Sequence, residues 1–410
     1  MIAIKKRKRI NYVFELLIVL MALVFCTPIL GGTKYLVFVG LAIGIYIAYH
    51  FQDIYNNRNV KLVNCVLLYL ILVFGYRLFG VSDAAWGNYM HQLGFFLVML
   101  FMLFLKKERM LAQEKILLLA VLGIIAINVV DNIYLSILYP QLNTGRTYMD
   151  EEFLATLNAG GSPYYTFVLF CFDICFFVFL NSNRKLVRNT ALACAIICAV
   201  YICGYCFKAS VVVYFFLSLL FIYYAKRTKN QFKFLFVFSI TCLLAYITVS
   251  LFSEEIVDFV KYISPNERLT TRFVTLVDSE DADANMVTVT GRTSRYLESV
   301  EGWLTDIGTF LFGMGDHRAV FRGGETGVGQ HSDLLDSLAR YGLFGILLLA
   351  FIFKYAFNYI LSCFDKKYRL QIICILVVFL LCGLTKKIFF PSSGFAIFLL
   401  LPLMGKYINK

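Results

Sequence analysis

Charged side chains are scarce in this sequence. Asp, Glu, Lys and Arg make up only 16% of its 410 residues, whereas hydrophobic residues make up 60%. A typical soluble domain is roughly a quarter charged and about half apolar, so no single water-soluble core could bury this chain. The same composition excludes a disordered chain, a collagen-like repeat and a small disulfide scaffold. The sequence therefore predicts an all-α integral membrane protein with many spans.

The sequence also lacks the common motifs that hold a metal ion or a nucleotide phosphate. It has only four histidines, no H-E-x-x-H pair and no Cys/His cluster. The glycine-rich stretch 323–329 has neither a Walker lysine nor a preceding strand, so it predicts a mobile turn. The 12 cysteines lie in or beside apolar runs, where helical spacing favours packing residues over a metal or redox pair. We expect no cofactor and no metal, and Asp281 with Asp283 is the first place where this expectation could fail.

Twelve apolar runs approach the length of about 20 residues that a membrane helix needs. When the basic tract 5–9 is placed in the cytoplasm, the other basic tracts beside spans fall on the same side. An even number of spans then places both termini in the cytoplasm, and the first run is expected to be retained, not cleaved as a signal peptide. The runs are residues 11–30, 34–50, 60–80, 89–105, 114–138, 163–180, 189–206, 208–225, 232–252, 334–360, 369–388 and 391–407.

The net charge of +12 is unevenly distributed along the chain. The segment from Ser253 to Asp333 contains 14 acidic and 7 basic residues, so the rest of the chain has 31 basic against 12 acidic residues. This basic excess stands in short tracts beside the apolar runs, which indicates contact with anionic lipid on the cytoplasmic leaflet. No basic patch is interleaved with exposed aromatic residues, so we do not expect nucleic acid as a partner.

The runs divide the chain into three parts. Residues 1–252 contain nine spans, residues 253–333 form a large extracytoplasmic loop between spans nine and ten, and residues 334–410 contain the last three spans. An ordinary connector needs only a few residues, so a loop of this length is either functional or disordered. The aromatic and apolar residues between positions 292 and 321 favour a folded, functional loop.

Several charged residues lie within the predicted spans, where charge is costly and marks a candidate functional site. The cations among them stand near the predicted outer ends, against the positive-inside trend. They could bind the phosphates of a lipid-linked substrate through charge-assisted hydrogen bonds, or they could extend to the lipid headgroups. Two carboxylates, Asp131 and Asp173, could pair with such cations. The four cations are Arg77, Lys208, Lys386 and Lys387.

His331 is the histidine best placed for chemistry. It lies where the glycine-rich turn meets the tenth run, and Asp333 and Asp336 follow it. An imidazole at this junction could take a proton from an acceptor hydroxyl, because histidine titrates closest to ambient pH. It could equally be a hydrogen-bonded interfacial residue. His317 is a weaker second candidate.

The end of the loop and the start of the tenth run carry a series of motifs that resembles the O-antigen ligase and polymerase family of bacterial surface-polysaccharide assembly. The similarity covers about 55 residues, while the rest of the chain agrees in its topology of about a dozen spans with a large, late outer loop. Ser332 stands where members usually have asparagine. The series is Gly291-Arg292, Trp303, Phe312-Gly313-Met314-Gly315, His331-Ser332-Asp333-Leu334-Leu335-Asp336 and Ala339-Arg340-Tyr341-Gly342-Leu343-Phe344-Gly345.

This resemblance implies a C-type glycosyltransferase architecture in the bacterial inner membrane, with an undecaprenyl-diphosphate-linked sugar as donor and no metal. By position, it implies that Arg292 holds the donor diphosphate and that His331 is the general base or orients the acceptor. Lys208 stands where members have an arginine, and lysine keeps the charge but loses the bidentate fork. Arg272 and Arg295 are expected as secondary phosphate contacts.

The function expected first is a polymerase of lipid-linked oligosaccharide repeats for O-antigen, capsule or exopolysaccharide. Its partners would be the undecaprenyl-diphosphate-linked donor, the growing glycan acceptor, the lipid bilayer and a chain-length regulator. A ligase that transfers the glycan to lipid A core is an alternative, because it uses the same donor. A transporter or flippase is another, although the sequence has no second copy of the long loop, as repeated halves would require. A noncatalytic assembly partner is a third.

Overall fold

The structure of the protein is a computed structural model, and it describes ten ranges of the chain. The described ranges are residues 2–26, 33–55, 60–78, 83–106, 114–139, 162–206, 209–228, 296–297, 299–315 and 332–408. Within these ranges every regular element is a helix, and no strand is present. The predicted all-α class is therefore confirmed for this part of the chain.

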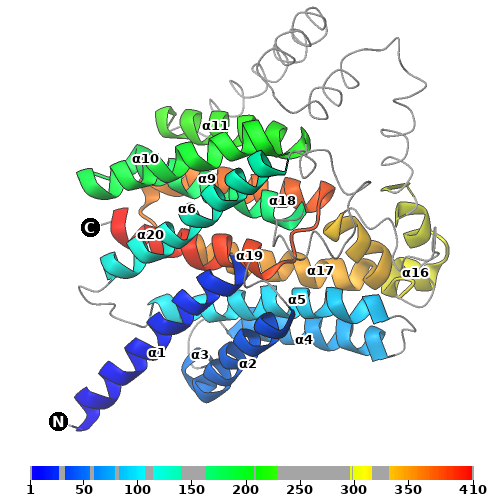
Figure 1. The fold of residues 1–410 in the computed structure, drawn as a ribbon. Coiled ribbons are helices and arrows are strands. Elements are labelled where there is room, and N and C mark those ends of the chain that lie inside the picture. Colours follow the sequence, from blue (N-terminus) through cyan, green and yellow to red (C-terminus); the bar gives the residue numbers. More distant parts are fainter. Residues whose placement is uncertain are drawn as a thin grey trace, which may run out of the picture.

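The described elements are long apolar helices and several short helical segments (Figure 1). Two segments, η3 and η5, are π-helical. The bounds are α1 (Ile2–Phe25), α2 (Thr33–Tyr49), α3 (Phe51–Tyr55), α4 (Val60–Leu78), α5 (Asp83–Phe101), η1 (Met102–Lys106), α6 (Glu114–Leu138), α9 (Ser162–Asn181), α10 (Lys185–Val200), η3 (Tyr201–Tyr205), α11 (Ala209–Arg227), α16 (Ile307–Phe312), α17 (Asp333–Leu361), η4 (Lys366–Tyr368), α18 (Arg369–Thr385), α19 (Pro391–Gly394), η5 (Phe395–Leu400) and α20 (Leu401–Ile408).

Seven of the described helical segments are long and apolar enough to cross a membrane: α4, α6, α9, α10 with η3, α11, α17, and η4 with α18. Four shorter apolar segments lie in α1, in α2, in α5 with η1, and from α19 into α20. Together they account for eleven of the twelve apolar runs in the sequence. The ninth run, residues 232–252, lies outside the described residues.

Large apolar side chains are exposed along single faces of these helices. On α2, Phe38, Leu41, Ile45 and Tyr49 are each more than 60% exposed. Their spacing places them on one side of the helix, and water would not tolerate so large a contiguous apolar surface. A surrounding bilayer accounts for this face, which supports a membrane-embedded, multi-pass protein.

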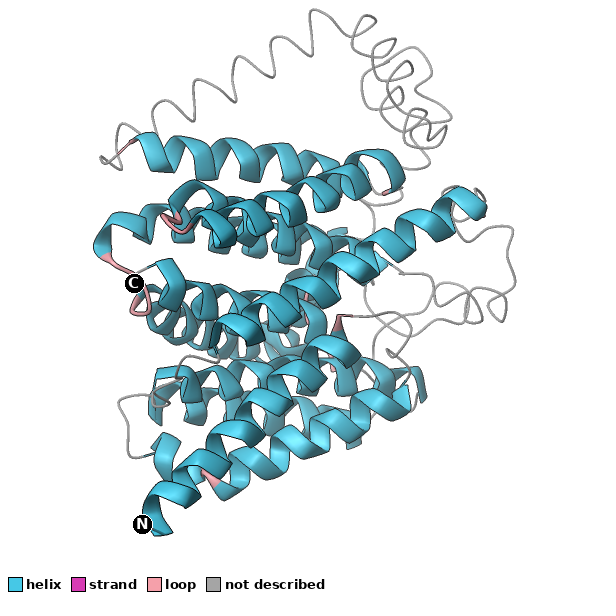
Figure 2. Ribbon diagram, turned by 60° about the vertical axis from the view of Figure 1, so that its left-hand side comes forward, coloured by secondary structure: helices cyan, strands magenta, loops and turns pink. Residues whose placement is uncertain are grey.

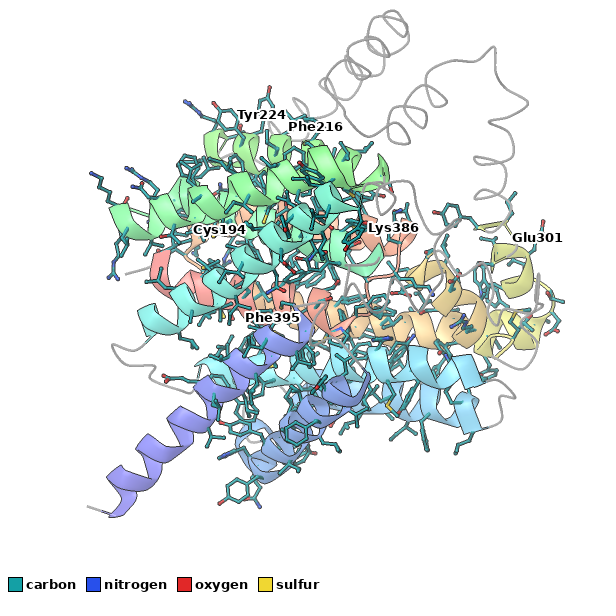
Figure 3. The ribbon with its side chains drawn as sticks, viewed as in Figure 1. Cys194, Phe216, Tyr224, Glu301, Lys386 and Phe395 are labelled. Atoms are coloured by element: carbon teal, nitrogen blue, oxygen red, sulfur yellow. The ribbon has the colours of Figure 1, made fainter. Side chains whose placement is uncertain are left out.

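The carboxyl-terminal segment lies in the middle of the bundle. The segment α19–η5–α20 contacts α5 and α9, while α18 contacts α11, α9 and α17. In Figures 1 and 2, α10 and α11 lie on one side of this central layer, and α4, α5 and α17 lie on the other. The two chain termini lie at the same end of the bundle, and α16 lies at the opposite end. Phe395, labelled in Figure 3, marks the buried centre.

The close packing of α5 against α19 depends on a glycine. A Cβ atom at Gly94 would lie 2.7 Å from Cγ of Pro391, which is too close for any side chain. Pro391 begins α19 because its fixed φ suits the first helical position, where a backbone N–H is not needed. The missing side chain of Gly94 therefore determines how closely the central layer approaches α5.

Replacing Gly94 by leucine should destabilise the protein, whereas the same replacement at Gly44 should not. Overpacking a tight contact costs about 1–3 kcal/mol, and nothing lies within 4 Å of a Cβ atom at Gly44 of α2. Thermal unfolding of purified Gly94→Leu and Gly44→Leu in detergent would measure the difference. Equal midpoints in the two variants would contradict this packing of α5 on α19.

Candidate functional site

A break in α17 is the centre of the candidate site. Gly342 has φ 62° and ψ −165°, so it interrupts the helix after its first nine residues. A break leaves the carbonyls before it without their helical donors. Two of them are satisfied from outside the helix: the N–H of Met314 donates to the carbonyl of Ala339 (2.9 Å), and the N–H of Gly315 donates to that of Arg340 (3.0 Å).

Two glycines make this contact possible. Gly313 also has a positive φ, 80°, and a Cβ atom on it would lie 2.2 Å from the carbonyl oxygen of Arg340. A Cβ atom on Gly342 would lie 2.4 Å from the nitrogen of Gly313. The two backbones therefore touch directly. The motif 312–315 and the motif 339–342, which are separate in the sequence series, form one structural unit.

The segment before this contact is fastened to the bundle. The hydroxyl of Tyr76, near the end of α4, donates to the carbonyl of Phe312 (2.5 Å). The indole N–H of Trp303 donates to the carbonyl of Phe310 (2.9 Å), and their rings stack with centroids 4.9 Å apart. The tryptophan of the motif series is therefore a local support for α16.

The first residue before α17 is a helix cap that also binds α18. The Oγ of Ser332 accepts the N–H of Leu335 (3.1 Å), as an N-cap side chain does. The same hydroxyl donates to the carbonyl of Gly383, near the end of α18 (3.1 Å), and Ser332 is fully buried. The start of α17 and the end of α18 are thereby held together.

Asp333 fastens the segment that follows α18. One carboxylate oxygen accepts the backbone N–H groups of Ile388 (2.5 Å) and Phe389 (2.6 Å). The N–H of Asp333 itself donates to the carbonyl of Lys386 (3.1 Å). A carboxylate in the first turn of a helix is also favoured by the helix dipole. Three hydrogen bonds therefore fix residues 386–389 against the start of α17.

Asp336 makes a similar contact to the returning part of the long loop. Its Oδ1 accepts the hydroxyl proton of Ser299 (3.0 Å), and both residues are buried. Arg340, one helical turn further along α17, is also buried. The two first-turn carboxylates of α17 thus each bind a different chain segment.

A third connection reaches α11. The hydroxyl of Tyr214 shares a hydrogen bond with Oγ1 of Thr385 (2.7 Å) and donates to the carbonyl of Leu381 (3.2 Å). The hydroxyl of Tyr296 donates to the carbonyl of Thr385 (3.2 Å). We call the whole assembly the α18 junction. Its members are Tyr214, Tyr296, Ser299, Ser332, Asp333, Asp336 and residues 383–389.

Five of the predicted site residues lie outside the described residues, and for three of them the structure places a residue nearby in the sequence. Ser332 directly follows His331, and Tyr296 directly follows Arg295. Tyr214 belongs to α11 and lies six residues after Lys208 in the sequence. These neighbours all belong to the α18 junction. The five residues are His331, Arg292, Lys208, Arg272 and Arg295.

The remaining three predicted cations are described. The sequence predicts Lys386 and Lys387 at the outer end of the eleventh span, within the run 369–388. In the structure α18 already ends at Thr385, so both lysines lie just beyond the helix, where the chain is extended before Pro391. Both lysines are half-buried within the α18 junction, and Figure 3 shows Lys386 just beyond α18. Arg77 lies in the last turn of α4 and is 3% exposed.

His91 is a further residue beside the junction that the sequence did not single out. Its ring lies 4.8 Å from the ring of Phe390, at the end of the segment that Asp333 holds. The positive charge of Lys387 interacts electrostatically with the imidazole of His91. No sequence motif marks His91 or Tyr214. Each comes from a helix distant in sequence, α5 or α11, and reaches the junction only through helix packing. The roles of Ser332 and Asp333 were readable in principle, since a serine before an apolar run followed by a first-turn aspartate is a typical helix start.

Among the residues that the structure describes, no three His, Cys, Asp or Glu side chains are grouped to hold a metal ion. Asp281 and Asp283 lie outside these residues. No model of a known protein family matches the sequence, and no curated protein matches it. The resemblance to the O-antigen ligase and polymerase family therefore depends on the motif series alone.

Replacing Gly342 by alanine should destabilise the break in α17. Its backbone conformation is one that only glycine adopts readily, and the strain for another residue is about 1–3 kcal/mol before the clash with Gly313 is counted. Thermal unfolding of Gly342→Ala and Gly313→Ala should show lower midpoints than Gly75→Ala on α4, where the added methyl meets nothing within 4 Å. A normal midpoint for Gly342→Ala would refute the interrupted helix.

Replacing Asp333 by alanine should release residues 386–389. The loss of charge-assisted hydrogen bonds is expected to cost about 1.5–3 kcal/mol, and Asp333→Asn should cost less because one acceptor oxygen remains. Hydrogen exchange at the amides of Ile388 and Phe389 should accelerate in Asp333→Ala. Asp365→Ala is the matched control, because Asp365 is exposed and its contact with Lys367 is a 3.9 Å surface pair. Unchanged exchange at both amides would show that Asp333 does not hold them.

Proposed function

We propose that this protein is a membrane glycosyltransferase that polymerises undecaprenyl-diphosphate-linked oligosaccharide repeats at the outer face of the bacterial inner membrane. The products would be O-antigen, capsule or exopolysaccharide. The proposal includes about twelve spans, cytoplasmic termini and catalytic motifs in the loop 253–333. It begins from the resemblance of the motif series to the O-antigen ligase and polymerase family.

The α18 junction is the observation that supports this proposal most strongly. It gathers the sequence neighbours of His331, Arg295 and Lys208 together with Lys386 and Lys387. These residues come from four separate parts of the chain. A site that binds a diphosphate and deprotonates a hydroxyl needs several cations and one base within a small volume, and such convergence is what the proposal requires.

The proposed reaction is a single group transfer. An acceptor hydroxyl attacks the anomeric carbon of the donor sugar, a new glycosidic bond forms, and the bond to the lipid diphosphate breaks. The hydroxyl proton passes to the base, and the diphosphate departs with the bonding electrons. Because this leaving group is already good, the protein need supply mainly orientation, cationic stabilisation and a base.

Each proposed residue has a distinct role in this reaction. His331 is the base or orients the acceptor, and Arg292 binds the departing diphosphate. Lys208, Arg272 and Arg295 add charge for the phosphates. Three further cations, Arg77, Lys386 and Lys387, belong to the same donor-binding set. No cofactor is proposed.

Hydrogen bonding in the junction is compatible with this charge distribution. Asp333 accepts two backbone N–H groups, and Asp336 accepts the hydroxyl of Ser299. Both carboxyl groups therefore already have hydrogen-bond partners within the protein. The lysines at 386 and 387 remain half-buried, where a phosphate could still reach them.

A ligase that transfers the glycan to lipid A core would use the same donor and the same residues. The two functions differ in the acceptor, and the growing glycan is our first choice. A chain-length regulator is a proposed partner of the polymerase. A transporter would instead move the lipid-linked repeat across the membrane without breaking the glycosidic bond.

His331→Ala and Arg292→Ala should each stop polymer growth while the protein remains in the membrane. Loss of a general base typically lowers a rate by about 100- to 10,000-fold, and loss of one group that stabilises developing charge by about 100- to 1,000-fold. Gel analysis of surface polysaccharide should show single lipid-linked repeats in place of the ladder. Protein level and membrane insertion are measured in parallel.

Arg318→Ala is the matched control, because Arg318 lies in the same long loop. His317→Ala tests the second candidate histidine of that loop. A full ladder is expected in Arg318→Ala, and His317→Ala separates the two loop histidines. Long surface polymer in both His331→Ala and Arg292→Ala would refute the site assignment. Repeats trapped on the cytoplasmic face would replace the polymerase with a flippase.

A further inference from the structure

Asp173 is a carboxyl group in the interior of the bundle, far along the chain from the α18 junction. It lies in the middle of α9, the most deeply buried of the candidate spans, and its side chain is completely buried. Neither of its carboxylate oxygens has a hydrogen-bond partner among the described residues. Among the described residues, none of the cations that the sequence suggested as a partner is found there.

The surroundings of Asp173 contain thiols and a hydroxyl but no cation among the described side chains. Cys198 of α10, Cys382 of α18 and Cys171 of α9 itself are the titratable groups that interact with it. Ser218 of α11 approaches it as well. The last helices packed on α9 add no charge, since residues 391–405 contain no Asp, Glu, Lys, Arg or His.

In the structure the hydroxyl of Ser218 does not donate a hydrogen bond to Asp173. Its proton is already donated to the carbonyl of Phe215 (3.0 Å), one turn earlier on α11. The oxygen of Ser218 still has lone pairs that can accept a hydrogen bond. A carboxylate offers only acceptors, whereas a carboxylic acid offers an O–H donor. The hydrogen-bonding pattern is therefore completed by the acid and not by the carboxylate.

We infer that Asp173 carries a proton in the folded protein and donates it to Ser218, so that α9 contains a proton-binding site inside the membrane. An unpaired charge at this depth would be very costly, which agrees with the hydrogen-bonding pattern. The proton can leave only when α9, α11 and α18 separate enough to admit water. Occupancy of the site therefore depends on whether this side of the bundle is closed.

Infrared spectroscopy of the purified, full-length protein in lipid tests this assignment directly. A protonated carboxyl group has a C=O stretch that is separate from the bands of a carboxylate. The difference spectrum between the parent protein and Asp173→Asn at neutral pH should show the loss of one acid C=O band. Asp365→Asn, at an exposed aspartate, should instead lose carboxylate bands.

Ser218→Ala provides a second variant in case Asp173→Asn does not fold. It removes the acceptor of the acid proton but keeps Asp173, so the acid C=O band should shift in frequency and remain present. The assignment is overturned if Asp173→Asn loses carboxylate bands, or if the parent protein has no acid band that Ser218→Ala moves. Both readouts are independent of glycosyl transfer.

Discussion

Backbone polar groups inside a membrane must be satisfied within the protein, and this requirement shapes the whole candidate site. Water is absent from the hydrocarbon region, so an interrupted helix is tolerated only where other protein groups replace the lost hydrogen bonds. In α17 the interruption at Gly342 is satisfied by N–H groups of Met314 and Gly315. The extended segment after α18 is satisfied in the same way by Asp333.

The break in α17 and the first turn of the same helix hold the returning end of the long loop against the bundle. The break in α17 holds residues 313–315, and the first-turn carboxylate of Asp336 holds Ser299. The described segment 299–315, which follows Arg292 and Arg295 in the sequence, is thereby held at both of its ends. A reaction that depends on orientation would benefit from this rigidity, because a displacement of about 1 Å can cost roughly 100-fold in rate.

Asp333 and Asp173 are stabilised by different interactions. Asp333 accepts backbone N–H groups at a helix start, where an anion is favoured. Among the described residues Asp173 has no such donor, and the hydroxyl of Ser218 donates its proton to the carbonyl of Phe215. Identical side chains therefore have opposite roles: Asp333 positions a segment through its charge, and Asp173 contributes a neutral donor.

The sequence by itself determined the all-helical membrane class and eleven of the described helical segments, because apolar runs of spanning length leave few alternatives. Its motif series also includes Gly313 and Gly342, whose backbones contact each other in the structure. Only the tertiary structure decided that Lys386 and Lys387 lie beyond α18 and that Tyr214 and Tyr296 meet at Thr385. It also decided that Asp173 has no hydrogen-bond partner for either carboxylate oxygen among the described residues. The physical reason is that hydropathy reports how each segment meets lipid, whereas hydrogen bonds between distant segments depend on how the helices pack.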